Sequence, residues 1–176
     1  MDVFSTCGKD GSIRLFDMRC LNKYSVLHEN SDQSPILRLS WNPVNSQTIA
    51  YLTENKSTVS LIDIRSPEQE LLLKSHNSPV NAVDWSPTQE NVLITAGEDK
   101  QVECVMELLM CSVWYGISTN CKKIVNVSWY ILVYQCVVTP SFIYSPSNAV
   151  NNVKWSKQKP KWIALCCNST LELCQV

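Results

Sequence analysis

Three residues that could form a catalytic relay lie within one short stretch of the chain. His76 precedes a predicted strand, Thr95 lies in the next predicted strand, and Asp99 follows in a turn. A hydroxyl, an imidazole and a carboxylate are the groups of a Ser/Thr–His–Asp relay. The chain contains no G-x-S-x-G nucleophile elbow, however. We therefore interpret the three residues as a buried hydrogen-bond network, because buried polar groups need partners.

Other reactive side chains do not have the spacing that a metal or cofactor site needs. The chain has nine cysteines, and none of them forms a C-x-x-C pair. His28 and His76 are the only histidines, so no zinc-ligand pattern can be assembled. The sequence also lacks a Gly-rich phosphate loop. We therefore expect buried reduced thiols, no metal, no cofactor, no small-molecule substrate and no enzyme activity.

A tryptophan that closes an apolar strand recurs along the chain and indicates which elements position these residues. The three copies are ILRLSWNP, VNAVDWSP and VNNVKWSK, at Ile36–Pro43, Val80–Pro87 and Val150–Lys157. Fourteen positions after each tryptophan comes a turn residue: Asn55, Asp99 and Ser169. Trp41 and Trp85 lie 44 residues apart, whereas Trp85 and Trp155 lie 70 apart. A period of about 40–45 residues with four short strands per unit is typical of a WD-repeat propeller.

The stretch FSTCGKDGSIRLFDMR predicts the hairpin of the first unit. Phe4–Cys7 reads as a strand, and Asp10-Gly11 is a two-residue turn signal, because both residues tolerate positive φ. Alternating residues that end in Phe16-Asp17 predict the second strand. Lys23–His28 predicts the outer strand, and the polar segment Glu29–Pro35 predicts a surface loop.

Two further features recur between the units. Thr6 and Asp10 have the same four-residue separation as Thr95 and Asp99, so the predicted blade network includes them. The core of the repeat is predicted from one aromatic residue in each unit: Phe16, Trp41, Trp85 and Trp155.

The predicted units divide the chain into five segments. Strands of the second unit are expected at Ile36–Trp41, Thr48–Leu52, Thr58–Asp63 and Glu70–Lys74, with a Ser66-Pro67 turn before the last. The third unit is expected to begin with Val80–Trp85 and Asn91–Ala96, followed by a Glu98-Asp99 turn. The segments are an incomplete blade (1–34), a complete blade (35–75), the start of a third blade (76–102), an insert (103–139) and an incomplete final blade (140–176).

Composition and charge exclude several classes of partner. The 176 residues are 45% hydrophobic and carry a net charge of −1, so no nucleic-acid partner is expected. The longest apolar-rich stretch, Ile124–Val138, has 15 residues and includes Asn126 and Ser128, which predicts no membrane span. No signal peptide is visible after Met1. We therefore expect an intracellular protein, cytoplasmic and nuclear, without a membrane partner.

These residues resemble a known family. The order His76, Trp85, Thr95, Asp99 resembles a WD repeat, and the first hairpin resembles its Trp-Asp ending with Phe16 in place of Trp. The resemblance narrows to the transparent-testa-glabra/anthocyanin-regulatory WD-repeat adaptors, whose animal member is a kinase-binding scaffold and cullin-4 ligase-associated factor. It covers roughly residues 1–102 and 141–176 and rests on Ile36–Asn42, Ile62-Asp63-Ile64-Arg65 and the C-terminal NNVKW…WIALCCNSTLELCQV.

The resemblance implies an all-β propeller that serves as a non-catalytic platform for kinases or transcription factors. The endings Asp17-Met18-Arg19 and Asp63-Ile64-Arg65 resemble the D-x-R ending with which some propellers dock on the adaptor subunit of cullin-4 ubiquitin ligases. The Asp would hold the strand end, and the Arg would present a planar fork to a partner. The alternative is a solvated Arg at the start of a loop, because interface and surface arginines look alike in sequence.

Residues 103–139 depart from the family pattern. By the spacing of the first unit, an aromatic and an Asp should stand at positions 105 and 106, where the chain has Val105 and Met106. The stretch contains four of the nine cysteines and no D-G turn. Our hypothesis is a gene-model artefact, such as translated intron or displaced exon sequence, that replaces the third strand. The alternative is a genuine lineage-specific insertion.

Chain length predicts an incomplete ring. Seven blades of about 42 residues each would need roughly 300 residues, and this chain accounts for about three to four blades of antiparallel sheet. We therefore expect the C-terminal portion of a larger adaptor, with a ring that is not closed. The expected function is a non-catalytic scaffold for protein–protein interactions. The alternatives are a substrate receptor of a cullin-4 ubiquitin ligase and, more remotely, a non-functional truncated gene model.

Overall fold

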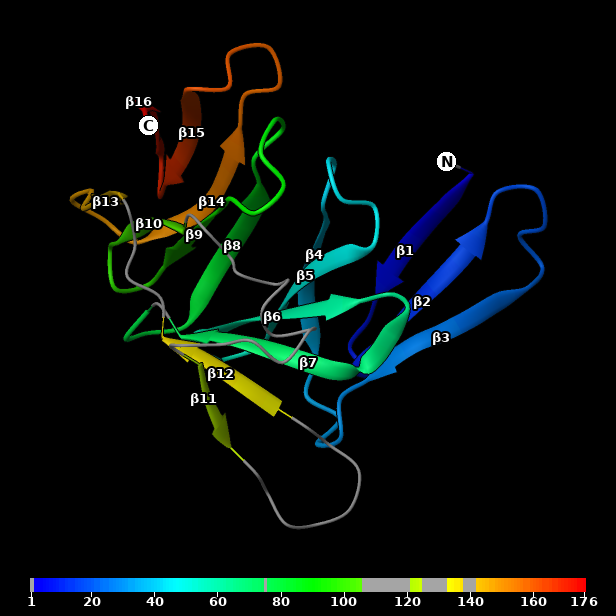
Figure 1. Ribbon diagram of the computed structural model, residues 1–176. Coiled ribbons are helices and arrows are strands. Elements are labelled where there is room, and N and C mark those ends of the chain that lie inside the picture. Colours follow the sequence, from blue (N-terminus) through cyan, green and yellow to red (C-terminus); the bar gives the residue numbers. More distant parts are fainter. Residues whose placement is uncertain (1, 75, 106–120, 125–132, 138–141) are drawn as a thin grey trace.

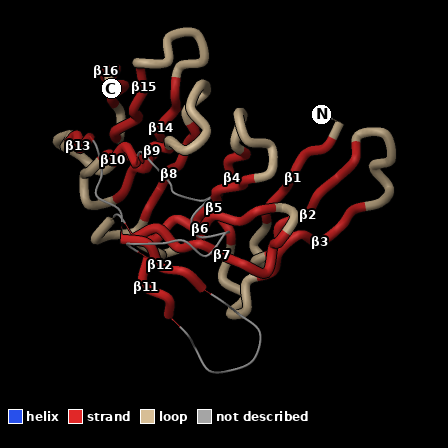
Figure 2. The backbone as a smooth tube through the Cα atoms, viewed as in Figure 1, coloured by secondary structure: helices blue, strands red, loops and turns tan. Residues whose placement is uncertain are grey.

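The computed structural model describes residues 2–74, 76–105, 121–124, 133–137 and 142–176. Every regular element within these ranges is a β-strand (Figure 2). The strands form four sheets that follow one another along an open arc, with the first and last sheets at its two ends (Figure 1). The expected all-β class and the open series of antiparallel blades are confirmed.

The first sheet contains three strands in chain order, β1 (Val3–Cys7), β2 (Ser12–Asp17) and β3 (Tyr24–Glu29). Its hairpin differs from the predicted two-residue turn, because the Gly8 amide bonds to the Ser12 carbonyl and leaves three loop residues. Only Gly11 of the predicted Asp10-Gly11 pair has a positive φ, at 73°. This is a type I turn followed by one left-handed residue, which suits the twist of a hairpin.

The second sheet contains a complete antiparallel blade. Its strands are β4 (Ile36–Trp41), β5 (Thr48–Thr53), β6 (Thr58–Asp63) and β7 (Ser66–Lys74), and β12 (Val133–Val137) and β11 (Cys121–Ile124) extend it beyond β7. The predicted Ser66-Pro67 turn is wrong, because both residues already belong to β7. The turn occurs at Ile64 and Arg65, where the Asp63 carboxylate accepts the Arg65 amide at 2.8 Å and reverses the chain earlier.

The third sheet has four strands. It consists of β8 (Val80–Trp85), β9 (Leu93–Gly97), β10 (Val102–Val105) and β13 (Phe142–Tyr144). The third strand that we expected residues 103–139 to replace is therefore present as β10, and residues 142–144 belong to this sheet rather than to the final blade. Most of residues 103–139 lie outside the described residues, so the artefact hypothesis stays a prediction. The last sheet contains β14 (Val150–Trp155), β15 (Trp162–Cys167) and β16 (Thr170–Gln175).

Three hydrophobic cores lie between the four sheets. The first joins Ile13 to Ile49, Tyr51 and Ile62 of the second sheet. The second core packs the other face of the second sheet against the third, with Ala50, Leu61 and Leu73 meeting Trp85 and Leu93. The third core joins the third and last sheets through Ala82, Ile94, Val102, Val153, Ile163 and Leu165. The two central sheets thus bury both faces.

The three repeated tryptophans end the equivalent strands β4, β8 and β14 but differ in environment, whereas Phe16 lies in β2 at the position of Ile62 in β6. Trp85 is 3% exposed and donates its indole N–H to the Ser40 carbonyl at 2.9 Å, across two sheets. Trp41 donates to Ser46 within its own loop, at 2.8 Å. Phe16, Trp41 and Trp155 are only half-buried. The tryptophan repeat therefore marks strand ends, and only Trp85 lies fully in a core.

Truncation of Leu61 tests the packing of the second sheet against the third. Leu61→Ala should lower the free energy of unfolding by about 2–5 kcal/mol, because Leu61 is 0% exposed and the change leaves a cavity. Leu37→Ala is the matched control, since Leu37 is 53% exposed and its truncation should cost no more than about 0.5 kcal/mol. Urea unfolding measures both variants, and equal losses would contradict the packing described here.

Candidate docking face

The structure brings His76, Thr95 and Asp99 together as predicted. His76 Nδ1 lies 3.0 Å from both carboxylate oxygens of Asp99, and Nε2 lies 2.8 Å from Thr95 Oγ1. With Nδ1–H donating to Asp99, Nε2 accepts the Thr95 hydroxyl proton. Thr95 is 0% and His76 1% exposed. A hydroxyl that is fully buried cannot reach a substrate, so this geometry suits a structural network.

Asp99 also holds the segments around it. One carboxylate oxygen accepts the Asn77 amide at 3.1 Å, and the other accepts the Gln101 amide at 3.2 Å. The carboxylate therefore connects the segment before β8 to the turn between β9 and β10. Gly97 is required beside it, because a Cβ there would lie 2.8 Å from His76 Nδ1 and 2.9 Å from the Asp99 carboxylate.

Thr6 and Asp10 do not form the corresponding network in the first sheet. Thr6 is exposed, and Asp10 accepts hydrogen bonds from the backbone and hydroxyl of Ser12 and from Arg14. A histidine equivalent to His76 would lie just before a strand equivalent to β8. In the first sheet β1 pairs with β2 as β9 pairs with β10, and none of the strands described for this sheet is equivalent to β8. The four-residue separation of Thr and Asp therefore does not form the network where the histidine is missing.

The second sheet has a polar cluster that the sequence patterns did not indicate. Tyr51 takes the place of Thr95, donates its hydroxyl to Glu70 at 2.6 Å and lies 2.9 Å from His28 Nε2. Burial and the nearby Glu70 carboxylate raise the pKa of Tyr51 well above its ordinary value. Because His28 belongs to β3, the cluster joins the first sheet to the second. His28 lies 23 residues before Tyr51 and Glu70 lies 19 residues after it, and this spacing matches no sequence motif.

The two D-x-R endings have the same geometry. Asp17 accepts the backbone amide of Arg19 at 2.9 Å, its Nε–H at 2.9 Å and a terminal N–H at 2.6 Å. Asp63 accepts the Arg65 amide at 2.8 Å and Nε–H at 3.0 Å. The Arg19 side chain is 73% exposed and that of Arg65 is 69% exposed. Each Asp therefore fixes a strand end and binds the Nε and Nη2 edge of an exposed guanidinium, so that this edge is held within the chain itself.

These contacts shift the titration of both carboxylates. Hydrogen bonds from the Arg19 side chain and backbone lower the pKa of Asp17 to about 2. Burial acts to raise the pKa of Asp63, but the hydrogen bonds from Arg65 outweigh it and the pKa lies below its ordinary value. Both Asp residues are thus ionised near neutral pH and keep their arginines in place.

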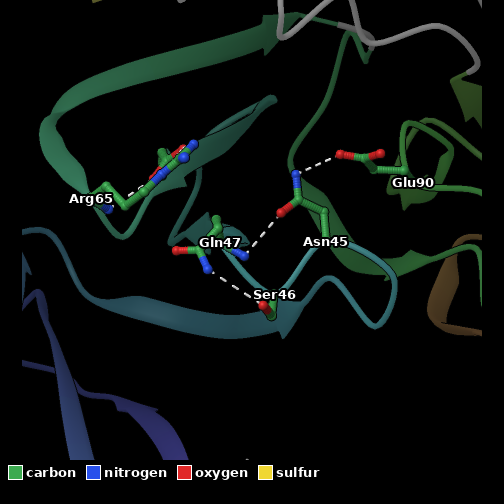
Figure 3. Close-up of polar contacts among 6 residues, drawn as sticks. Asn45, Ser46, Gln47, Arg65 and Glu90 are labelled. Atoms are coloured by element: carbon green, nitrogen blue, oxygen red, sulfur yellow. Dashed lines mark hydrogen bonds and ion pairs between the residues drawn. The ribbon is translucent and has the colours of Figure 1, made fainter.

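Neighbouring loops hold the Arg65 turn in position (Figure 3). The Gln47 carbonyl accepts the Ile64 amide at 2.8 Å, which ties the β4–β5 loop to the turn. Asn45 accepts the Gln47 amide at 3.0 Å and donates its side-chain N–H to the Glu90 carboxylate at 2.7 Å. Asn42 donates to the Glu90 carbonyl at 2.7 Å. We name the two D-x-R turns, together with the supporting residues Asn42, Asn45, Gln47 and Glu90, the docking face.

A shallow groove opens beside the docking face, between the first and second sheets. It has a volume of about 580 Å³ and is lined by Val3, Phe4, Ser5, Trp41, Asn42, Pro43 and Ser46. Asn42 also anchors its own loop by accepting the Val44 and Asn45 amides, both at 2.9 Å. Sequence reasoning missed Asn42, Asn45 and Glu90. The one available signal was an Asn directly after the repeated Trp, a residue type that favours side-chain-to-backbone turns.

Two further searches concern only the part of the chain that the structure describes. Nowhere there do three His, Cys, Asp or Glu side chains gather as a metal-binding group. Nor do those residues include a helix with the length and hydropathy needed to cross a membrane.

Substitution of Thr95 tests the buried network. Thr95→Val should lower the free energy of unfolding by about 1–3 kcal/mol, because the buried His76 ring nitrogen loses its partner. Thr6→Val is the matched control at the equivalent but exposed position and should change stability by no more than about 0.5 kcal/mol. Chemical denaturation measures both, and a neutral Thr95→Val would contradict a structural role.

Carboxyl NMR titration tests the D-x-R geometry. Asp17 should titrate at about 2, and Arg19→Gln should move its midpoint toward the ordinary value of 3.8. Because the folded pKa is depressed, the stabilisation by this pair is present above 3.8 and is lost as the pH falls through about 2. Lys9→Gln, at the opposite end of β2, should leave the midpoint unchanged. A midpoint near 3.8 in the unmodified chain would contradict the bidentate contact.

Sequence comparison with known proteins agrees with the fold described above. Residues 67–104 match the family model described as WD domain, G-beta repeat. The chain is 29% identical over 176 residues to the DDB1- and CUL4-associated factor 7 homolog of Dictyostelium discoideum, covering 99% of the chain and 47% of that protein. It is 32% identical over 118 residues to a WD repeat-containing protein of Saccharomyces cerevisiae (57% and 23% covered). It is 30% identical over 159 residues to the GATOR2 complex protein WDR24 of Gallus gallus (90% and 18% covered).

The chain thus spans about half the length of the Dictyostelium relative and a smaller part of the other two. The family model covers β7 to β10, including the His76 network and the strand that ends in Trp85. Four successive antiparallel blades, the recurring strand-end tryptophans and this match all agree. The described part of the chain thus folds as an open series of sheets of the β-propeller type, and residues 67–104 of it match a WD repeat.

Proposed function

We propose that the chain is a non-catalytic scaffold that binds other proteins through the docking face. The observation that carries this proposal is the pair of D-x-R turns, in which each guanidinium is oriented by its own Asp and is still mostly exposed. A guanidinium that is held in place before binding loses less conformational entropy when a partner carboxylate engages it. Rigid strands with recognition in their end loops are a common arrangement for binding proteins.

A DDB1–CUL4 assembly is the partner that we propose for this face. The Dictyostelium relative, which aligns with nearly the whole chain, is named as associated with DDB1 and CUL4. In this chain, Arg19 and Arg65 stand at the same end of equivalent strands, because Asp17 pairs with Val3 as Asp63 pairs with Thr48. Two arginines presented alike can contact one partner at two points. The role would then be that of a substrate receptor of a cullin-4 ubiquitin ligase.

The finer partner classes rest on the family resemblance. We propose kinases and transcription factors as the proteins brought together, as the resemblance to the transparent-testa-glabra adaptors implies. These partners would place the protein in the cytoplasm and the nucleus. The side of the propeller opposite the docking face, where the Glu98-Asp99 turn and the Asn30–Pro35 loop lie, is available to a second partner while the docking face is occupied.

Charge reversal at the two arginines tests the proposal. Arg19→Glu/Arg65→Glu should weaken binding of the chain to purified, immobilised DDB1 by about tenfold or more, because each change places a repulsive charge at the contact. The matched control is Lys9→Glu/Lys100→Glu, which changes the charge equally at the opposite strand ends and should bind as the unmodified chain does. Circular dichroism checks that both variants fold. Equal binding by all three proteins, or no binding by the unmodified chain, would overturn DDB1 docking through this face.

A further inference from the structure

The two sheets at the ends of the arc each leave one apolar face uncovered (Figure 1). On the first sheet the exposed side chains are Phe4 (38% exposed), Tyr24 (59%) and Val26 (47%), beside Phe16. Their rings form a continuous surface, with the Phe4 and Phe16 centroids 5.2 Å apart and those of Phe16 and Tyr24 5.6 Å apart. On the last sheet the exposed side chains are Trp162 (39%), Leu171 (72%) and Leu173 (65%).

Strand pairing shows which buried face of the second sheet is equivalent to the exposed face of the last sheet. Leu173 pairs with Ala164 across β16 and β15, as Leu61 pairs with Ala50 across β6 and β5. Leu61 and Ala50 are 0% exposed, because the third sheet covers them. We name this side of a sheet, which meets the next sheet along the chain, its trailing face.

The exposed face of the first sheet corresponds to the opposite side. Phe4 pairs with Phe16 across β1 and β2, as Ile49 pairs with Ile62 across β5 and β6. Ile49 and Ile62 are 0% exposed, because they pack against Ile13 of the preceding sheet. We name this side the leading face. Each of the three cores therefore joins one trailing face to one leading face.

The charges on the two uncovered faces are compatible with the packing of one face on the other. Arg14 is the cation on the leading face, and it is already paired with Asp10 and lies 5.7 Å from the centre of the Tyr24 ring. The trailing face presents Ala164, Leu171 and Leu173 with the uncharged Cys166 and Gln175, and its cation Lys154, opposite Ala164, is paired with Asp84 of the third sheet at 2.8 Å. Both cations are thus already paired within their own copy, and the carboxylate of Glu29 lies near Arg14 at the end of β3, opposite Ser12, so the apolar centre of each face carries no unpaired charge to bury.

We propose that two copies of this chain associate head to tail, with the leading face of each copy packed on the trailing face of the other. A contact between two different surfaces repeats at both ends of the arc, so it can close into a ring of two copies. The ring would contain eight sheets, within the range of about 4–8 blades seen in propellers.

The mass of the 176-residue chain in solution tests the proposal. Light scattering coupled to size exclusion at micromolar concentration should give twice the chain mass of 20.0 kDa. Leu171→Glu/Leu173→Glu alters only the trailing face and Tyr24→Glu/Val26→Glu only the leading face, and each variant alone should be monomeric. All four residues are at least 47% exposed, so the folded chain should tolerate the changes. Leu37→Glu, at an exposed residue on neither face, should remain dimeric.

Mixing the two variants distinguishes this arrangement from other dimers. Each variant keeps the face that the other has lost, so the mixture should regain a dimer through one contact, with weaker association than the unmodified chain. Dimerisation of the trailing-face variant alone would show that like faces meet and would overturn the proposal. A monomeric unmodified chain would also overturn it, as would a ladder of masses above the dimer, which indicates an open filament. The D-x-R arginines are unchanged in all of these proteins, so DDB1 binding is tested separately.

Discussion

Burial of both sheet faces is the constraint on which the rest of the structure depends. In the second sheet every residue of β5 is buried, and so is nearly every residue of β6. A strand with one face in water would carry its apolar residues on the other face alone, whereas these two strands bury apolar residues on both faces. One sheet alone could not bury such a sequence. The blades are therefore stable only as neighbours, as in other repeat architectures.

Several carboxylates stand at the ends of strands, where they fix turns. Asp99 holds the β9–β10 turn through His76 and two backbone amides, and Asp17 and Asp63 hold the turns after β2 and β6. In each case a carboxylate accepts N–H groups that the reversing backbone would otherwise leave without partners. A rigid strand end is also a good support for recognition, because a side chain beside it has little freedom to lose on binding.

At the two ends of the arc, one face of the sheet is not buried against a neighbouring sheet. Phe4, Leu171 and Leu173 occupy positions whose equivalents in the second sheet, Ile49, Val59 and Leu61, are in the cores, and here they face water. Monomeric proteins rarely expose contiguous apolar surface of this kind. The same feature that stabilises the central sheets therefore gives the molecule two complementary surfaces, separate from the docking face.

The sequence by itself determined the class of the fold and most of its strands. Recurring tryptophans, apolar runs and turn residues predicted β4 to β9 to within two residues at most ends, and the spacing of His76, Thr95 and Asp99 predicted their contact. These features are local in the sequence or repeat at a constant period, so they can be recognised from the sequence alone. Tertiary structure decided the rest: that Thr6 stays exposed, that β10 pairs with β13, and that Asn45 and Glu90 support the Arg65 turn. Each of these depends on which distant segments lie side by side, and burial is a property of the neighbours rather than of the residue.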